Sequence, residues 1–262
     1  LEIPENEPID YVIMAVPAPI CPQLLEEVGK KGVPFVTIFS SGFSEIGNKD
    51  LEKKLLEIAR KYNMRIIGPN CLGIYNPKSK LAVSRWHTTE SGNFGVISQS
   101  GGLSINISNM ATYTYGTNVS KLISIGNQID LNVVDFLKYF LKDQETKVIG
   151  IYLENIKSQK TGREFLHVVK ELSLNKKPVI LWKVGSGESA REAIFSHTGG
   201  MAGSTRIWKA IASQTGAILV QDSFELVTLA MAFNYLDIEL VDRNLGIVAV
   251  GGGSSIELTE QM

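Results

Sequence analysis

The fold class is decided by the stretch Gly95-Val96-Ile97-Ser98-Gln99-Ser100-Gly101-Gly102. A short apolar run passes through small hydroxyl residues into glycines that open a helix, as in one βα unit of a parallel sheet. On both sides of this stretch, apolar runs of strand length alternate with amphipathic helical segments. The predicted fold class is therefore α/β.

Two series of such units follow one another. The first predicts strands at residues 11–16, 35–39 and 65–67, with helices near residues 21–31 and 49–62. The second predicts five strands, at residues 93–97, 120–125, 148–153, 179–183 and 217–220. Residues 68–92 are rich in Pro, Asn and Gly and lack a period, so they are predicted to cross between two domains.

Composition excludes several classes of protein. A formal net charge of −1, without a long basic block, argues against a nucleic-acid partner. No apolar run approaches the roughly 20 residues that span a bilayer. Cys21 and Cys71 are too few for a disulfide framework and lack metal-ligand spacing, so we expect no metal site and a cytoplasmic setting. Because residue 1 is Leu and residues 245–255 resemble a strand entering a glycine-rich turn and the start of a helix, we expect a longer parent polypeptide.

Ligands of open α/β sheets bind beyond the carboxyl ends of strands, so the turns there carry the candidate sites. Val16-Pro17-Ala18-Pro19 and Ser40-Ser41-Gly42-Phe43 could form two walls of one crevice, or simply be rigid turns. Gly68-Pro69-Asn70-Cys71-Leu72-Gly73 suits close approach of a ligand to the backbone, although a structural turn with a buried Cys would look similar. After residue 97, the segment from Ser98 to Gly102 predicts a phosphate-binding helix start, with simple capping by Ser98 or Ser100 as the alternative.

Ser196-His197-Thr198-Gly199-Gly200 belongs to a polar, glycine-rich loop that exposes a histidine to chemistry. A histidine nucleophile needs a partner on its second ring nitrogen, a role that suits the carboxylate of Glu154 at the end of a predicted strand. His87 lies in the crossing and His167 on a helix, so neither has this context. Taken alone, a loop histidine such as His197 is more often an ordinary surface residue than a nucleophile.

Six motifs in this order resemble the α subunit of succinyl-CoA synthetase and, more closely, the nucleoside-diphosphate-forming acetate–CoA ligases of that superfamily. They are the VPAP turn, GPNCLGIYNP, GVISQSGG, GNQID at residues 126–130, YLE ending at Glu154, and SHTGGMAGS. The resemblance implies a Rossmann-like CoA-binding domain that is N-terminally incomplete, followed by a flavodoxin-like ligase domain. The implied division is a partial CoA-binding domain at 1–80, a linker at 81–92, a ligase domain at 93–235, and at 236–262 a linker and the truncated start of a further ligase domain.

The resemblance also implies roles for individual residues. His197 matches the phosphorylated histidine and Glu154 the carboxylate that orients it. The other implied site residues are, for phosphate, Ser98, Ser100, Gly101, Gly102, Gly199 and Gly200, and for CoA, Val16, Pro17, Ser41, Gly42, Asn70 and Cys71.

The implied reaction is reversible acyl-CoA synthesis from a small carboxylic acid, CoA and ATP, through acyl phosphate and phosphohistidine. ATP or ADP and Mg²⁺ would bind to an ATP-grasp subunit or domain outside this chain, and the assembly would be an oligomer. One rival is a CoA-responsive regulatory region of a protein acetyltransferase, against which the SHTGG loop and Glu154 argue. A dinucleotide-dependent oxidoreductase is a second rival, but no complete GxGxxG fingerprint supports it.

Overall fold

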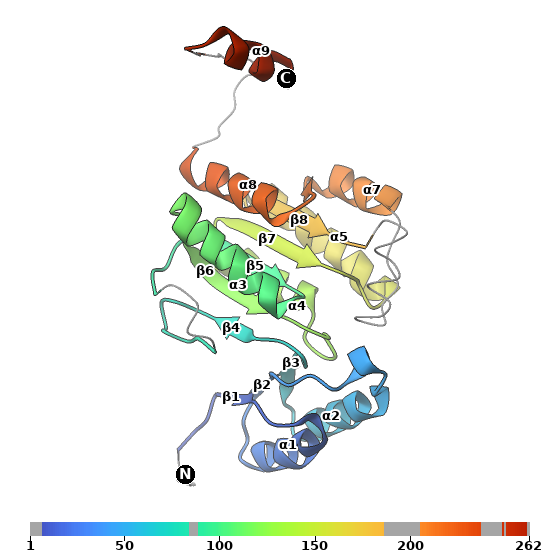
Figure 1. Cartoon of the computed structure of the whole chain (residues 1–262). Helices are drawn as coiled ribbons and strands as arrows, with labels where there is room; N and C mark the ends of the chain where they lie inside the picture. The colour runs from blue at the N-terminus through green and yellow to red at the C-terminus, as the bar shows by residue number, and fades with distance from the viewer. Residues whose placement is uncertain (1–6, 84–88, 186–204, 237–247, 249, 261–262) are drawn as a thin grey trace.

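Two parallel-stranded sheets organise the chain, and Figure 1 shows the N-terminal sheet below the second one. The computed structural model describes residues 7–83, 89–185, 205–236, 248 and 250–260. Within those residues, the strands and helices alternate as expected of an α/β protein. The predicted fold class is confirmed.

The N-terminal sheet has three parallel strands in the order β1-β2-β3. Its elements are β1 (Tyr11–Met14), η1 (Ala18–Ile20), α1 (Cys21–Lys30), β2 (Phe35–Ile38), η2 (Ser44–Ile46), α2 (Lys49–Lys61) and β3 (Arg65–Ile67). Both α-helices are strongly amphipathic, so they bury one apolar face and leave charges on the other. Leu25 and Leu55 from these helices meet Val36 and Ile38 of β2 in one buried cluster.

The second sheet has six strands in the order β4-β6-β5-β7-β8-β9. The strands are β4 (Gly73–Tyr75), β5 (Phe94–Ser98), β6 (Val119–Ser124), β7 (Val148–Leu153), β8 (Val179–Lys183) and β9 (Ile218–Val220). From β5 onward the strands are parallel in the order 2-1-3-4-5, which is the flavodoxin-like arrangement. β4 adds an antiparallel strand at the edge, paired with β6.

Helices cover both faces of the second sheet, because its strands are apolar on both sides. On one face lie α3 (Gly101–Asn109), the π-helical turn η3 (Met110–Thr114) and α8 (Ser223–Tyr235). On the other lie α4 (Val133–Lys142), α5 (Gln159–Leu174) and α7 (Thr205–Thr215). α9 (Gly252–Glu260) stands apart from both sheets (Figure 1). None of the helices in the described part of the chain is long and apolar enough to cross a membrane.

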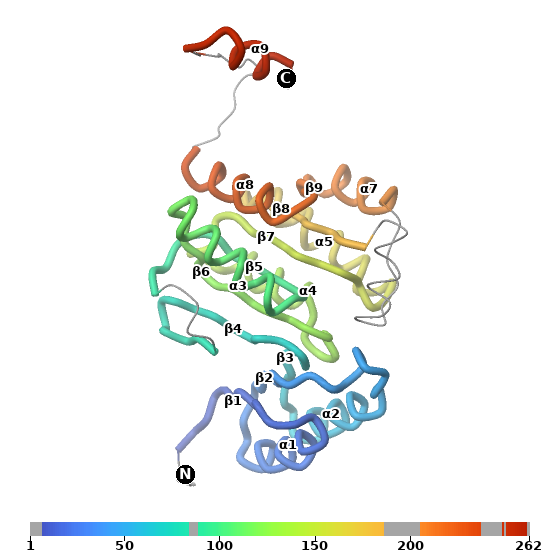
Figure 2. The backbone as a smooth tube through the Cα atoms, viewed as in Figure 1, coloured from blue at the N-terminus to red at the C-terminus, as the bar shows by residue number. Residues whose placement is uncertain are grey.

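The path between the sheets differs from the prediction in one respect. The stretch 68–92 was predicted as a crossing between domains and no strand was assigned to it, yet β4 lies within it, and Figure 2 shows the chain running from β3 through β4 into the second sheet. β4 begins with a glycine and lies between segments rich in Pro, Asn and Gly, so the sequence around it resembles a loop. Pairing therefore places β4 with the second sheet, and the proposed domain boundaries stay a prediction.

The structure describes only part of the strand, turn and helix start that were predicted near the C-terminal end. The predicted strand around residues 245–250 lies mostly outside the described residues. The helix expected after the glycine-rich turn is present as α9.

Candidate functional site

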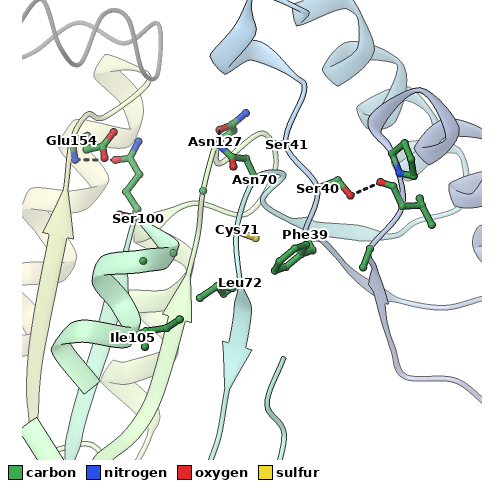
Figure 3. A pocket seen from close by; sticks show the side chains of 17 residues that line it. Phe39, Ser40, Ser41, Asn70, Cys71, Leu72, Ser100, Ile105, Asn127 and Glu154 are labelled. Atoms are coloured by element: carbon green, nitrogen blue, oxygen red, sulfur yellow. Dashed lines mark hydrogen bonds between the residues drawn. The ribbon is translucent and has the colours of Figure 1, made fainter. Parts of the chain in front are cut away.

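A cleft of about 710 Å³ lies between the loops at the strand ends of the two sheets. Its walls are the turns that follow β1, β2, β3, β5, β6 and β7, the positions at which α/β sheets bind ligands. Figure 3 shows Glu154 and Ser100 on one side of the cleft, Ser40 on the other, and Asn70 and Asn127 between them.

The cleft gathers most of the predicted site residues that the structure describes. Those lining it are Val16, Pro17, Ser41, Asn70, Cys71, Ser100, Gly101, Gly102 and Glu154. Gly42 and Ser98 are each one residue from the lining and do not line it themselves. His197, Gly199 and Gly200 lie outside the described residues.

The first wall is built from the two predicted crevice turns, and they are joined. Ser40 Oγ donates a hydrogen bond to the Val16 carbonyl oxygen. Glu45 braces the Ser41-Gly42 turn, because its carboxylate accepts hydrogen bonds from the backbone N–H groups of Gly42 and Phe43. Burial opposes the ionisation of Glu45, but the hydrogen bonds from Asn127 and these two amides outweigh it and lower the pKa of the carboxyl group. The turn is therefore held by an ionised carboxylate.

Asn70 and Cys71 form the base of this wall and differ in chemistry. Asn70 adopts a left-handed backbone (φ 58°), and its N–H donates to the Ser40 carbonyl oxygen at 2.9 Å. Cys71 is 4% exposed, and burial raises the pKa of its thiol to about 12. A thiol with that pKa is not a nucleophile at neutral pH. Asn70 thus presents a polar side chain to the cleft, while the Cys71 side chain packs in the hydrophobic core.

Asn127 joins the two domains at the cleft, a role that sequence analysis missed. Its side-chain N–H₂ donates to Glu45 Oε2 at 2.6 Å, Glu52 Oε1 at 2.9 Å and Ser44 Oγ at 3.3 Å. Its backbone N–H donates to the Pro69 carbonyl oxygen at 2.9 Å. The motif GNQID was noticed, but a local pattern could not show which loop of the first domain it would meet.

The approach at this junction requires a glycine before Asn127. Gly126 has φ +49°, and a Cβ on it would lie 2.2 Å from the Pro69 carbonyl oxygen and 2.5 Å from that of Asn70. Real Cβ atoms are not found at such distances, so a side chain there would force the two loops apart. The backbone of the second domain therefore lies directly against the Asn70 turn.

The opposite wall is the turn from β5 into α3. Ser98 is fully buried, and its Oγ donates to the Ser100 carbonyl oxygen at 2.7 Å and accepts from the Ser100 N–H at 3.2 Å. Ser100 caps α3 by accepting from the Leu103 N–H at 3.4 Å. Capping, the alternative given above, is thus present, and the start of α3 still points its positive dipole end at the cleft. Gly102 lines the cleft, and a Cβ on it would meet no heavy atom within 4 Å.

Glu154 follows β7 directly and is 6% exposed. Tyr152 Oη donates to Glu154 Oε1 at 3.3 Å, and burial, together with this carboxylate, raises the pKa of the tyrosine so that it remains a donor. Lys183 lies on β8, where burial lowers the pKa of its ammonium group to about 8 while the charge of Glu154 acts in the opposite direction. Glu154 also lies beside the turn from β5 into α3, because its backbone N–H donates to Gln99 Oε1 at 2.9 Å.

Further lining residues carried no signal that sequence analysis used. Phe39, Leu72 and Ile105 give the cleft an apolar portion, seen beneath Ser100 and Cys71 in Figure 3. Gln99 also lines the cleft, although it sits inside the turn already predicted as a site. In the described part of the chain, no group of three or more His, Cys, Asp or Glu side chains could hold a metal ion.

The arrangement can bind a ligand that is polar at one end and apolar at another. Backbone amides at a helix start suit a phosphate, and a buried carboxylate beside them suits orientation of a neighbouring imidazole or proton donor. The opposite wall offers Asn70 and the Ser41 turn to a second ligand across the cleft. The two walls thus present polar groups from both parts of the chain to one shared space.

Family models match both parts of the chain. Residues 1–77 match a CoA binding domain, and residues 91–233 match the succinyl-CoA ligase like flavodoxin domain. Together they account for both sheets and the helices around them.

Homologous proteins are similar in sequence to the chain along nearly all its length. It is 40% identical over 96% of its residues to an ADP-forming acetate–CoA ligase of Methanocaldococcus jannaschii, covering 35% of that protein. It is 39% identical over 99% of its residues to the α subunit of ADP-forming acetate–CoA ligase I of Pyrococcus furiosus, covering 55% of that subunit. The chain thus spans about a third to a half of the length of these relatives.

A solved structure has the same fold. Acetyl-coenzyme A synthetase 1 of Candidatus Korarchaeum cryptofilum, in complex with phosphate and ADP, superposes with a TM-score of 0.90 at 34% identity. The match covers 97% of this chain and 54% of that one.

Proposed function

Because this chain belongs to the succinyl-CoA ligase-like family that includes the ADP-forming acid–CoA ligases, we propose that it is the acyl-CoA-handling part of such a ligase. The family resemblance predicted from six ordered motifs is confirmed. The proposed overall reaction joins a carboxylic acid to CoA while ATP is converted to ADP and phosphate, and it is reversible. The activity of the whole protein is a proposal, since the chain covers about a third to a half of its relatives.

The observation that carries this proposal is the cleft between the two sheets. It brings the Ser41 and Asn70 turns of one domain opposite Ser100 and Glu154 of the other. An enzyme that transfers an acyl group between CoA and phosphate has to hold both side by side. Two facing turns, one with amides at a helix start, are suited to that task.

We assign the steps to the residues as follows. The Ser41 and Asn70 turns hold the thioester end of CoA, and the acyl group lies against Phe39, Leu72 and Ile105. The start of α3 holds phosphate, which attacks the thioester to give an acyl phosphate and free CoA. The imidazole of His197 then attacks the phosphorus of the acyl phosphate, forming phosphohistidine and releasing the carboxylic acid as carboxylate, while Glu154 orients the ring so that its other nitrogen attacks.

The partners follow from the same reaction. A nucleoside diphosphate must receive the phosphoryl group from His197, so we propose an ATP-grasp subunit or domain that binds ATP or ADP and Mg²⁺. We also propose that the assembly is oligomeric and works in the cytoplasm. The acid itself is not specified by the lining of the cleft.

The test is transfer of labelled phosphate to the protein. The full-length protein, or this chain with its nucleotide-binding partner, is incubated with γ-labelled ATP and Mg²⁺. Acid-labile, base-stable label is expected in the wild type and in His167→Ala, whose histidine lies exposed on α5, and should vanish in His197→Ala. Absence of label in folded, nucleotide-binding wild type would instead favour the CoA-responsive regulatory region.

A further inference from the structure

The peptide groups around Glu154 are held from two sides. Gln99 Oε1 accepts hydrogen bonds from the backbone N–H of Glu154 at 2.9 Å and of Asn155 at 3.2 Å. Lys183 Nζ donates to the Glu154 carbonyl oxygen at 2.8 Å and also to that of Val184. These contacts join the ends of β5, β7 and β8, three neighbouring strands of the sheet.

The hydrogen bonds of Gln99 extend the pairing between β5 and β7 beyond the ends of the two strands. The Gln99 N–H still donates to the Tyr152 carbonyl oxygen at 3.1 Å, as in the parallel ladder. Two residues beyond Tyr152, just after the end of β7, the N–H of Glu154 donates to the Gln99 side chain in place of a backbone acceptor. Gln99 is 7% exposed and Glu154 is 6% exposed, so two N–H groups without this acceptor would be costly to bury.

Gln99 also lies between the two serines of the phosphate-binding turn. Ser98 Oγ is bonded to the Ser100 backbone on both its donor and its acceptor side, which fixes the backbone around residue 99. The position of this turn and the position of Glu154 are therefore set by one side chain. Lys183 completes the support from the other side, with its ammonium group 5.3 Å from the centre of the Trp208 ring.

We propose that Gln99 and Lys183 are positioning residues that hold the Glu154 carboxylate in register with the phosphate-binding turn for phosphoryl transfer to His197. This inference rests on the proposed function and adds two residues to it. Gln99 acts through the N–H groups of Glu154 and Asn155, and Lys183 through the Glu154 carbonyl oxygen. Displacement of a reacting group by about 1 Å can cost roughly 100-fold in rate, so loss of either contact should act on the phosphoryl transfer.

The first experiment removes the acceptor of Gln99 and keeps its size. Full-length Gln99→Met is compared with wild type and with Gln221→Met, a matched change at an exposed glutamine outside the cleft. With acetyl-CoA and labelled inorganic phosphate, the rate of phosphohistidine formation should fall roughly 10- to 100-fold in Gln99→Met only. The KM for acetyl-CoA should change less than about twofold, because the Ser41 and Asn70 turns that are proposed to hold its thioester end lie on the other wall.

The second experiment tests Lys183 by rescue. Lys183→Met removes both hydrogen bonds and should slow phosphohistidine formation, whereas Lys183→Arg keeps a cationic donor and should retain most of the rate. Lys170→Met, at an exposed lysine of α5, is the matched control. Equal loss in Lys183→Arg and Lys183→Met would overturn the role of Lys183 as a donor.

A third measurement is independent of activity. Hydrogen exchange of the peptide that contains Glu154 and Asn155 should be about tenfold faster in Gln99→Met than in wild type, because two amides lose their acceptor. The outcomes separate the two claims. A wild type that takes up no label from γ-labelled ATP and Mg²⁺ overturns the proposed function, whereas a labelled wild type matched by an equally fast Gln99→Met overturns the positioning role alone.

Discussion

Replacement of Gly102 by alanine should make the protein more stable and less active. Gly102 is the second residue of α3, and an added Cβ would meet no heavy atom within 4 Å. Because glycine inside a helix costs roughly 0.5–1 kcal/mol relative to alanine, the free energy of unfolding should rise by about that amount. For a chain of this size, 1 kcal/mol corresponds to a rise in Tm of about 2–4 °C.

The same methyl group would stand in the cleft that Gly102 lines. There it would keep phosphate from the backbone amides at the start of α3. A hydrogen bond to a charged group contributes about 1.5–3 kcal/mol, so the loss of one such contact should lower kcat/KM for phosphate by roughly 10- to 100-fold. Stability and activity are thus expected to change in opposite directions.

The assay needs a control that separates the two effects. Gly162 lies within α5, away from the cleft, and a Cβ on it would also meet nothing within 4 Å. Gly162→Ala should raise Tm by a similar amount and leave the phosphate-dependent release of CoA from acetyl-CoA unchanged. If Gly102→Ala is as active as Gly162→Ala, phosphate does not approach this helix start and the reasoning is wrong.

Two further predictions concern the junction of the domains. Asn127→Ala removes the donor to Glu45 and Glu52 and should lower the free energy of unfolding by about 3 kcal/mol, which denaturant titration would measure; an unchanged midpoint would contradict the bridging role. Because the pKa of Glu45 is lowered in the fold, its contribution to stability is present above its ordinary value of 4.5 and is lost as the pH falls through the lowered pKa. Glu45→Gln should therefore be less stable than wild type at pH 7, with a difference that shrinks in acid; a difference that stays constant with pH would count against this account.

Sequence patterns were sufficient to predict the fold class and to point to the turns that form the walls of the cleft. Alternating apolar runs and helical segments predicted the α/β layers, because burial on both faces of a parallel sheet leaves a strong local signal. The rule that ligands bind beyond the carboxyl ends of strands then pointed to the turns that contain Ser41, Asn70 and Ser100, and Glu154 was predicted as the carboxylate partner of His197. All four line the cleft.

The features that were missed depend on contacts between distant segments. The role of Asn127 requires knowing that the loop after β6 meets the loop after β2, which no spacing along the chain reveals. Gln99 looked like one more residue of a polar turn, since its partners at 154 and 155 are distant in sequence. For Cys71 the sequence predicted the position in the turn but not the chemical state. The structure shows that the residue is buried, and burial raises the pKa of the thiol so that it stays protonated.

The short strand β4 has a consequence for how the ligase domain can be isolated. β4 covers the outer edge of β6, a strand whose six residues are all buried. A truncated protein that begins at residue 93 would present that edge with its N–H and C=O groups unpaired, which is a template for association with another chain. One that begins before Gly73 would carry its own protective strand, so the segment that links the two domains also protects the ligase domain from aggregation.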